Sequence, residues 1–211
     1  MQSFQAGLDW SGKPELSARP DTFIACFVAV SEGDALRLRF DALRQKAREG
    51  ARDELHGHKM TPPFLAAALR IGLDLEMRVG ALCIDKRASA QAGKWTQDKT
   101  LYEATALELW PEFLQRTPLA RLVHDADIEG KVRPKVFATE LKRIAGQLGM
   151  RGLKAKPLPS AKSDLIQLAD IVAYTLSRQV NGQKVETEIL ELWEEIRGAK
   201  INIVRGPEIW E

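Results

Sequence analysis

Several acidic residues of this chain lie at positions from which strands and helices could bring their carboxylates together. They lie at the ends of apolar segments, between two helices, or inside an apolar helix, and they are Asp9, Glu54, Asp125, Asp127 and Asp170. Clustered carboxylates repel one another, and hard cations such as Mg²⁺ or Mn²⁺ relieve that repulsion with oxygen ligands. Two such ions about 4 Å apart can activate a water and stabilise a leaving oxygen in phosphodiester cleavage. The pattern therefore predicts a site for two Mg²⁺ or Mn²⁺ ions.

Asp170 is the most informative of these residues because the segment around it, 163–177, is largely apolar. On a helix, its polar members recur every three or four positions and so form one narrow stripe. These members are Ser163, Gln167, Asp170, Tyr174 and Ser177. A carboxylate buried without a partner costs several kcal/mol, so Asp170 must be neutralised, paired or bound to a metal. A structural Asp satisfied by a cap, a Lys or an Arg is the alternative explanation.

The elements that would position these residues alternate along the chain. Apolar, β-branched segments predict strands at 5–10, 23–30, 77–84, 121–125, 153–158 and 201–204. Amphipathic segments predict helices from about 31 to 50, from Pro62 through Ile71, and over 99–115, 134–148, 163–177 and 186–197. Such alternation is typical of the α/β class, with a mixed sheet flanked by helices. We expect one domain over residues 1–211, with 184–211 as a C-terminal extension packed on it.

Composition excludes several functional classes. The chain has 211 residues and a formal net charge of +2, which permits a nucleic-acid partner but is far from the charge of a dedicated electrostatic binder. The longest clean apolar run, 23–30, is too short to span a membrane. The first residues lack a basic segment followed by an apolar one, so we expect no secretory signal. Cys26 and Cys83 lie in strand-like runs, so we expect buried, reduced thiols in a cytoplasmic protein.

The order of these motifs resembles the DUF3800 family over roughly residues 5 to 180. The matching pieces are Asp9-Trp10-Ser11-Gly12, Glu54-Leu55-His56-Gly57, Asp125 after an apolar strand, Ser160-Ala161-Lys162-Ser163, and Leu165-Ile166-Gln167-Leu168-Ala169-Asp170-Ile171-Val172-Ala173. The last piece, which is the most specific, is similar to the family's Leu-Gln-Leu-Ala-Asp signature. The first motif departs from the family's pattern, since Trp10 stands where an acidic residue is usual.

This resemblance implies a ribonuclease H-like fold and an acidic site of Asp9, Glu54, Asp125 and Asp170. It also implies a bacterial context, since the family is common in bacteria. Asp127 is the alternative to Asp125 as the third carboxylate. The implied activity is that of a metal-dependent nuclease with nucleic acid as its substrate.

Several residues beside the acidic site are candidates for binding substrate. Trp10 can stack on a base or serve as a core aromatic, and Ser11 is its neighbour in the same motif. Either His56 or Lys59 can face substrate phosphates, and Lys131 belongs to a basic cluster suited to a nucleic-acid backbone. Lys162 can bind a phosphate or offset Asp170. Ser163 and Asp164 are expected to cap the helix that follows them.

Two other functions remain open from the sequence. His56 and His58 would share one face of a strand and, with Asp125, could bind zinc in a metallohydrolase. Alternatively, the two histidines belong to a polar turn before Pro62. The third hypothesis is a non-catalytic module that keeps the acidic helix for partner binding or for structure. The nuclease hypothesis predicts loosely held Mg²⁺ or Mn²⁺, the zinc hypothesis predicts stoichiometric zinc, and the third predicts no metal affinity.

Overall fold

The strands form one mixed sheet in the computed structural model, which describes residues 3–13, 21–46, 54–87, 101–126, 134–199 and 202–205. The strands are β1 (Phe4–Ser11), β2 (Thr22–Val30), β3 (Arg78–Asp85), β4 (Leu119–Asp125), β5 (Lys154–Leu158) and β6 (Ile203–Arg205). Within the described residues their order is β5-β4-β1-β2-β3-β6. β2 is antiparallel to both β1 and β3, whereas the pairs β1–β4, β4–β5 and β3–β6 are parallel. The predicted mixed sheet is confirmed.

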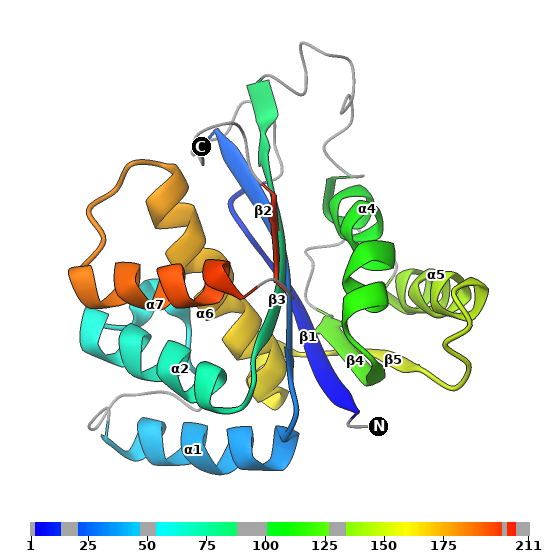
Figure 1. Ribbon diagram of the computed structural model, residues 1–211, viewed down its shortest axis with the longest axis horizontal. Helices are drawn as coiled ribbons and strands as arrows, with labels where there is room; N and C mark the ends of the chain where they lie inside the picture. The colour runs from blue at the N-terminus through cyan, green and yellow to red at the C-terminus, as the bar shows by residue number, and fades with distance from the viewer. Residues whose placement is uncertain are drawn as a thin grey trace.

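Helices cover both faces of this sheet, which Figure 1 shows edge-on between two helical layers. The helices are α1 (Gly33–Lys46), α2 (Pro62–Asp74), α4 (Leu101–Arg116), α5 (Pro134–Gln147), α6 (Asp164–Val180) and α7 (Thr187–Gly198), with the short 3-10 helices η1 (Gly57–Lys59) and η3 (Ser160–Lys162). α1, α2, α6 and α7 lie on one face, and α4 and α5 lie on the other. Each layer has its own apolar core against the sheet.

Local sequence signals explain where these elements lie. All nine residues of β2 are buried, as expected for a strand covered on both faces. Ser163 is the N-cap of α6, and its hydroxyl accepts a hydrogen bond from the backbone N–H of Ile166 at 3.4 Å. Asp164, predicted to share the capping, instead forms an ion pair with Arg44 of α1.

The C-terminal segment contributes to both the core and the sheet. Trp193 of α7 is fully buried, and its indole N–H donates to the hydroxyl of Thr175 in α6 at 3.2 Å. β6 extends the sheet by pairing with β3.

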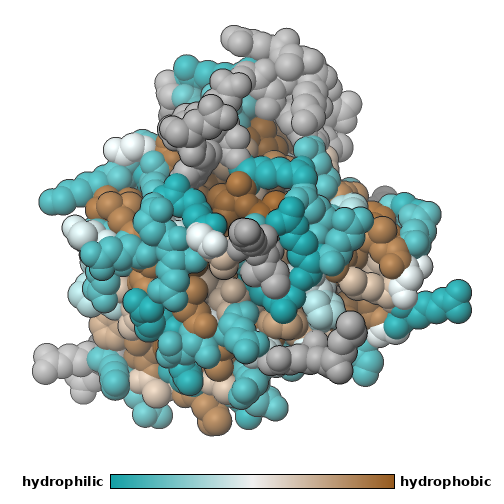
Figure 2. All heavy atoms as spheres, in the orientation of Figure 1, coloured by the Kyte–Doolittle hydropathy of each residue, from teal (hydrophilic) through white to brown (hydrophobic). Residues whose placement is uncertain are grey.

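Cys26 and Cys83 are free and buried, as predicted. In the described part of the chain, no helix has the length and apolar character that crossing a membrane requires. Hydrophilic residues cover most of the face seen in Figure 2, where apolar residues are scattered.

Helix α6 approaches the strand β1 closely at Gly7. A Cβ atom on Gly7 would lie 2.1 Å from the carbonyl oxygen of Leu165 and 2.8 Å from the backbone nitrogen of Ile166. Both contacts are with backbone, so no side-chain rotation can relieve them. Glycine at position 7 therefore sets how closely the first turn of α6 packs on β1.

Gly7→Ala should destabilise the protein by about 3 kcal/mol, because α6 must move away from β1 to admit the methyl group. Gly146→Ala is the matched control, since a Cβ there meets nothing within 4 Å and alanine is a better helix former than glycine. Urea unfolding of both variants measures the difference. Equal midpoints for the two variants would show that the contact at Gly7 does not limit the packing.

Candidate acidic site

Two of the predicted carboxylates come from neighbouring parallel strands. β1 and β4 pair in register from Gln5 with Arg121 to Leu8 with His124, so Asp9 and Asp125 follow the last pair at the same ends of the two strands. Side chains alternate between the two faces along a strand, so Asp9 points to the same face of β1 as Gly7, which contacts α6. Val123, in the core on the α6 face, likewise has the parity of Asp125. Both carboxylates therefore lie on the sheet face that α6 covers.

The third carboxylate, Asp170, comes from α6. It also contacts the segment before η1, which carries the fourth carboxylate, Glu54. Its Oδ2 accepts a hydrogen bond from the backbone N–H of Gly57 at 2.8 Å, and His56 Nδ1 lies 3.6 Å from the same oxygen. His56 Nε2 lies 3.1 Å from Glu54 Oε2. The imidazole thus stands between two carboxylates, which raises the pKa of His56, chiefly through its hydrogen bond to Asp170. Asp170 is one-fifth exposed, so it is less buried than its apolar helix predicted.

A buried glutamine fixes the same segment from the preceding turn of α6. Gln167 Oε1 accepts hydrogen bonds from the backbone N–H of Leu55 at 3.0 Å and from Arg44 at 2.8 Å, while its amide donates to the carbonyl of Ser160 at 3.0 Å. Arg44 also pairs with Asp41 at 2.7 Å and with Asp164. This network joins α1, η3 and the segment that carries Glu54 to one turn of α6.

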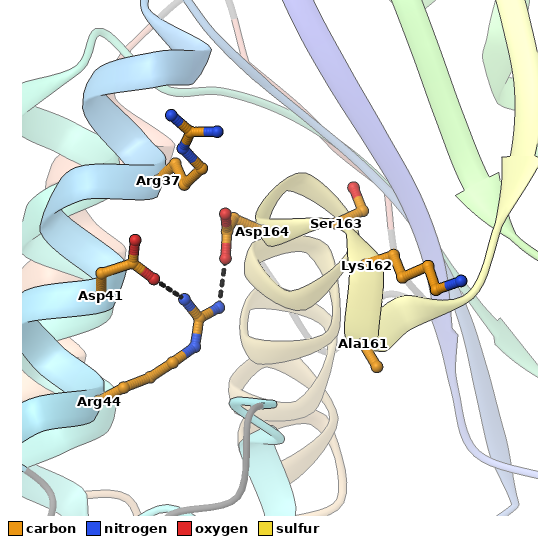
Figure 3. A pocket seen from close by; sticks show the side chains of 7 residues that line it. All are labelled: Arg37, Asp41, Arg44, Ala161, Lys162, Ser163 and Asp164. Atoms are coloured by element: carbon orange, nitrogen blue, oxygen red, sulfur yellow. Dashed lines mark hydrogen bonds and ion pairs between the residues drawn. The ribbon is translucent and has the colours of Figure 1, made fainter.

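Arg44 stands at the wall of an open pocket of about 290 Å³ between α1 and the start of α6 (Figure 3). Its guanidinium bridges Asp41 and Asp164, and Lys162 points away from this group. Of the cations that line this pocket, Arg44 is therefore already engaged and Lys162 is directed elsewhere.

Electrostatic repulsion couples Asp9 to the other three carboxylates. The pKa of Asp9 is raised well above its ordinary value, first by burial and then by the negative charges of Asp170 and Asp125, with a smaller contribution from Glu54. A hydrogen bond with the backbone of Trp10 opposes this shift. Cys26 lies opposite Asp9 on β2, and burial together with Asp9 raises the pKa of its thiol. The site thus concentrates negative charge on a largely apolar sheet face.

The donor set fits an oxygen-bound cation such as Mg²⁺ or Mn²⁺. Three carboxyl groups act electrostatically on Asp9, and Oε1 of Glu54 is buried without a hydrogen-bond partner among the described residues. A hard cation would satisfy that oxygen and offset the repulsion on Asp9. As the described side chains stand, however, no group of three or more His, Cys, Asp or Glu residues is arranged to hold a metal ion. The carboxylates share a face without forming a closed ligand set.

The histidine pair does not have the geometry that the zinc hypothesis requires. His58 is exposed in η1, so the two histidines belong to a 3-10 turn rather than to one face of a strand. Their rings are 5.5 Å apart between centroids. Both ring nitrogens of His56 already face carboxylates of Glu54 and Asp170. In the described part of the chain, His56 and His58 therefore do not form, with Asp125, the set of zinc ligands that this hypothesis requires.

The predicted substrate-binding residues separate into two groups. Ser11 lies two residues beyond Asp9 and shares its face of β1, and Lys59 is exposed close enough to His56 to lower its pKa. Lys162 is exposed in η3. Trp10 contradicts the stacking interpretation, because it points to the opposite face, where its indole donates to the carbonyl of Tyr102 at 3.1 Å. Asp127 and Lys131 lie outside the described residues.

Two residues that hold the site were not predicted to position it. Gln167 stood in the polar stripe and in the signature motif, and Gly57 stood in the Glu54 motif, but the partners of Gln167 come from segments far away in sequence. Gly57 is buried against Tyr174, whose Cβ would lie 2.7 Å from a Cβ at position 57. The spacing between Gln167 and Asp170, one helical turn, was the available signal for a shared partner.

Comparison with known proteins gives the fold but no family. No family model matches the chain, and no curated protein matches it. Among solved structures, the chain is similar to ribonuclease HII in the PCNA:RNase HII complex from Archaeoglobus fulgidus, with a TM-score of 0.54 and 16% sequence identity. The alignment covers 100% of this chain and 96% of that chain. The fold is ribonuclease H-like. At this identity the similarity establishes the architecture alone.

Gln167→Ala should lower the free energy of unfolding by about 2 kcal/mol, because it leaves the Leu55 N–H and one Arg44 contact without their acceptor. The amide of Leu55 should exchange faster with solvent, whereas amides in the middle of β2 should not. Gln167→Glu keeps an oxygen for both donors and should restore the slow exchange. Hydrogen exchange read by NMR checks all three proteins. Unchanged exchange at Leu55 in the alanine variant would show that other contacts hold this segment.

Proposed function

We propose that this protein is a divalent-metal-dependent nuclease that hydrolyses phosphodiester bonds of nucleic acid. The observation that carries the proposal is the electrostatic coupling of Asp9 with Asp170, Asp125 and Glu54 on one face of a ribonuclease H-like sheet. The motif resemblance to the DUF3800 family supports the same assignment. The structural alternative was an Asp170 satisfied by a cap, a Lys or an Arg. Its contacts are the backbone N–H of Gly57, the first residue of η1, which is a capping contact, and the imidazole of His56, with no Lys or Arg among the described partners.

In this proposal Asp9, Glu54, Asp125 and Asp170 would hold two Mg²⁺ or Mn²⁺ ions, with Asp127 as a further candidate. When bound, such ions lower the pKa of an attacking water and stabilise the departing oxygen. The chain's own residues prepare the site. Gly57 N–H orients the Asp170 carboxylate, and Gln167 holds the segment that positions Glu54. The strand pairing of β1 with β4 fixes Asp9 beside Asp125.

His56 would hold a proton beside the reacting groups. Its ring bridges Glu54 and Asp170, and these carboxylates favour its charged form. A cationic imidazole at this place offsets part of the negative charge that the acidic site presents to a phosphate. Lys59, exposed beside it, adds a second positive charge on the same side.

Asp170→Asn should lower cleavage by on the order of a hundredfold or more, because a neutral amide binds a hard cation poorly. The assay uses labelled DNA, RNA and hybrid substrates with Mn²⁺ and with chelator. Asp34→Asn is the matched control, since Asp34 is exposed in the first turn of α1. It should keep full activity. No metal-dependent cleavage of any substrate by the parent protein would overturn the nuclease proposal.

Asp9→Asn should stabilise the metal-free protein at neutral pH by on the order of 1 kcal/mol, because it removes a repelled, partly buried charge. The pKa of Asp9 is raised in the folded state, so its charge destabilises the fold above that pKa and has no effect once both states are protonated. The gain should therefore fade as the pH falls towards about 4. With millimolar Mn²⁺ the ranking should reverse, since only the parent gains stability from the ion.

Thermal melts at both pH values, with metal and with chelator, measure this effect, and Asp34→Asn again serves as the control. A non-catalytic acidic module predicts the same gain in the metal-free protein but no response of either protein to Mn²⁺. An Asp9→Asn variant that is less stable at neutral pH would show that the charge of Asp9 is compensated in the fold.

A further inference from the structure

The sheet face that carries the acidic site continues past α6 onto β4 and β5. These strands pair in parallel, with Arg121 opposite Lys154, Val123 opposite Lys156, and Asp125 opposite Leu158. Val123 and Leu158 pack in the core on the α6 face, and Leu122 and Ala155 pack in the core on the other face. Because side chains alternate, Arg121, Lys154 and Lys156 lie on the same face as Asp125.

This part of the face carries exposed positive charge. α6 packs mainly on β1 and β2, and α5 packs on the opposite face of β5. Lys154 and Lys156 are exposed and Arg121 is half-buried. The chain then leaves β5 for η3, where Lys162 is also exposed. We call Arg121, Lys154, Lys156 and Lys162 the basic strip.

We propose that the basic strip binds the phosphate backbone of the nucleic-acid strand whose cleaved bond lies at the acidic site, an inference that rests on the proposed function. Lys154 and Lys156 are two positions apart on a strand, which places them about 7 Å from each other along β5. Lys156 is also diagonal to Asp125 in the sheet. A backbone lying along β5 would therefore pass from the lysines directly to the carboxylates.

Electrostatics explains why the site needs this strip. Four carboxylates repel a polyanion, and the net charge of +2 is too small to draw nucleic acid to the protein as a whole. Attraction must therefore come from cations that are local to the site. On this face of β4 and β5, Asp125 is the one carboxylate among the strand residues, and it stands at the end nearest the acidic site. Positive charge along β5 and on η3 thus adjoins the negative charge of the acidic site on one continuous surface.

The strip was not visible as a group in the sequence. Lys154 and Lys156 form an alternating pattern with Ala155, which is typical of an edge strand with one solvated face. That ordinary explanation accounts for their exposure. It does not account for Arg121, which lies beside Lys154 on the neighbouring strand, or for Lys162 on η3, which follows the end of β5 that is nearest Asp125.

The test compares two double variants that remove equal charge. Lys154→Ala/Lys156→Ala removes the centre of the basic strip, and Lys142→Ala/Lys184→Ala removes two exposed lysines on α5 and on the turn after α6. Binding of a short fluorescein-labelled DNA or RNA strand is measured by anisotropy in chelator, so that no cleavage occurs. Thermal melts confirm that both variants fold, and Lys154→Arg/Lys156→Arg is the rescue.

The strip variant should bind on the order of tenfold more weakly than the parent near 0.1 M salt. Its plot of log affinity against log salt should be shallower by about 1.5, as the loss of two phosphate contacts predicts. The control and the arginine variant should match the parent. In cleavage assays with Mn²⁺, the strip variant should show a raised KM with kcat largely kept.

Equal losses in the strip variant and the control would overturn the proposal, because net charge alone would then govern binding. An unchanged affinity, salt slope and KM in the strip variant, with Asp170-dependent cleavage intact, would also overturn it and leave the nuclease function standing. A parent protein that neither binds nor cleaves nucleic acid would remove both proposals together.

Discussion

The approach of α6 to β1 is the constraint on which the rest of this structure depends. At Gly7 the helix backbone contacts the strand so closely that a single methyl group has no room. This contact fixes the height of α6 above the sheet, and the helix then carries Asp170 to the carboxyl end of β1, where Asp9 lies. The same helix orients Glu54 and His56 through Gln167 and Asp170. The acidic site is therefore built by one helix on one strand, with β4 supplying Asp125.

The charge at this site opposes the stability of the fold that creates it. Burial and three neighbouring carboxylates raise the pKa of Asp9, and one oxygen of Glu54 is buried without a partner among the described residues. Sites that bind charged ligands commonly contain such unfavourable arrangements, because the ligand and not the protein completes the interactions. His56 supplies partial compensation from within the chain. The stability of the surrounding cores maintains the arrangement.

Much of the architecture could be predicted from the sequence because burial leaves periodic signals. The continuous apolar run of β2 and the N-terminal proline of α2 indicated their elements directly. Asp170 stood out because a carboxylate in an apolar helix violates that periodicity. The face to which Trp10 points was not predictable without the register, since strand parity decides whether a residue joins Asp9 or the opposite core. The Leu55 contact with Gln167 joins residues more than a hundred positions apart, so no local pattern encodes it.

The order of the strands has a consequence for synthesis of the chain. β1 and β2 form a hairpin from the first segment, and β3 extends it, but β4 joins β1 only after residue 119. The face of β1 around Gly7 receives its covering helix later still, when α6 has been made. A nascent chain thus exposes the apolar α6 face of its hairpin during most of translation, a state prone to aggregate. Pairings of such long sequence separation also fold slowly. The carboxylates of Asp9 and Asp170 can therefore come together only after α6 has been made.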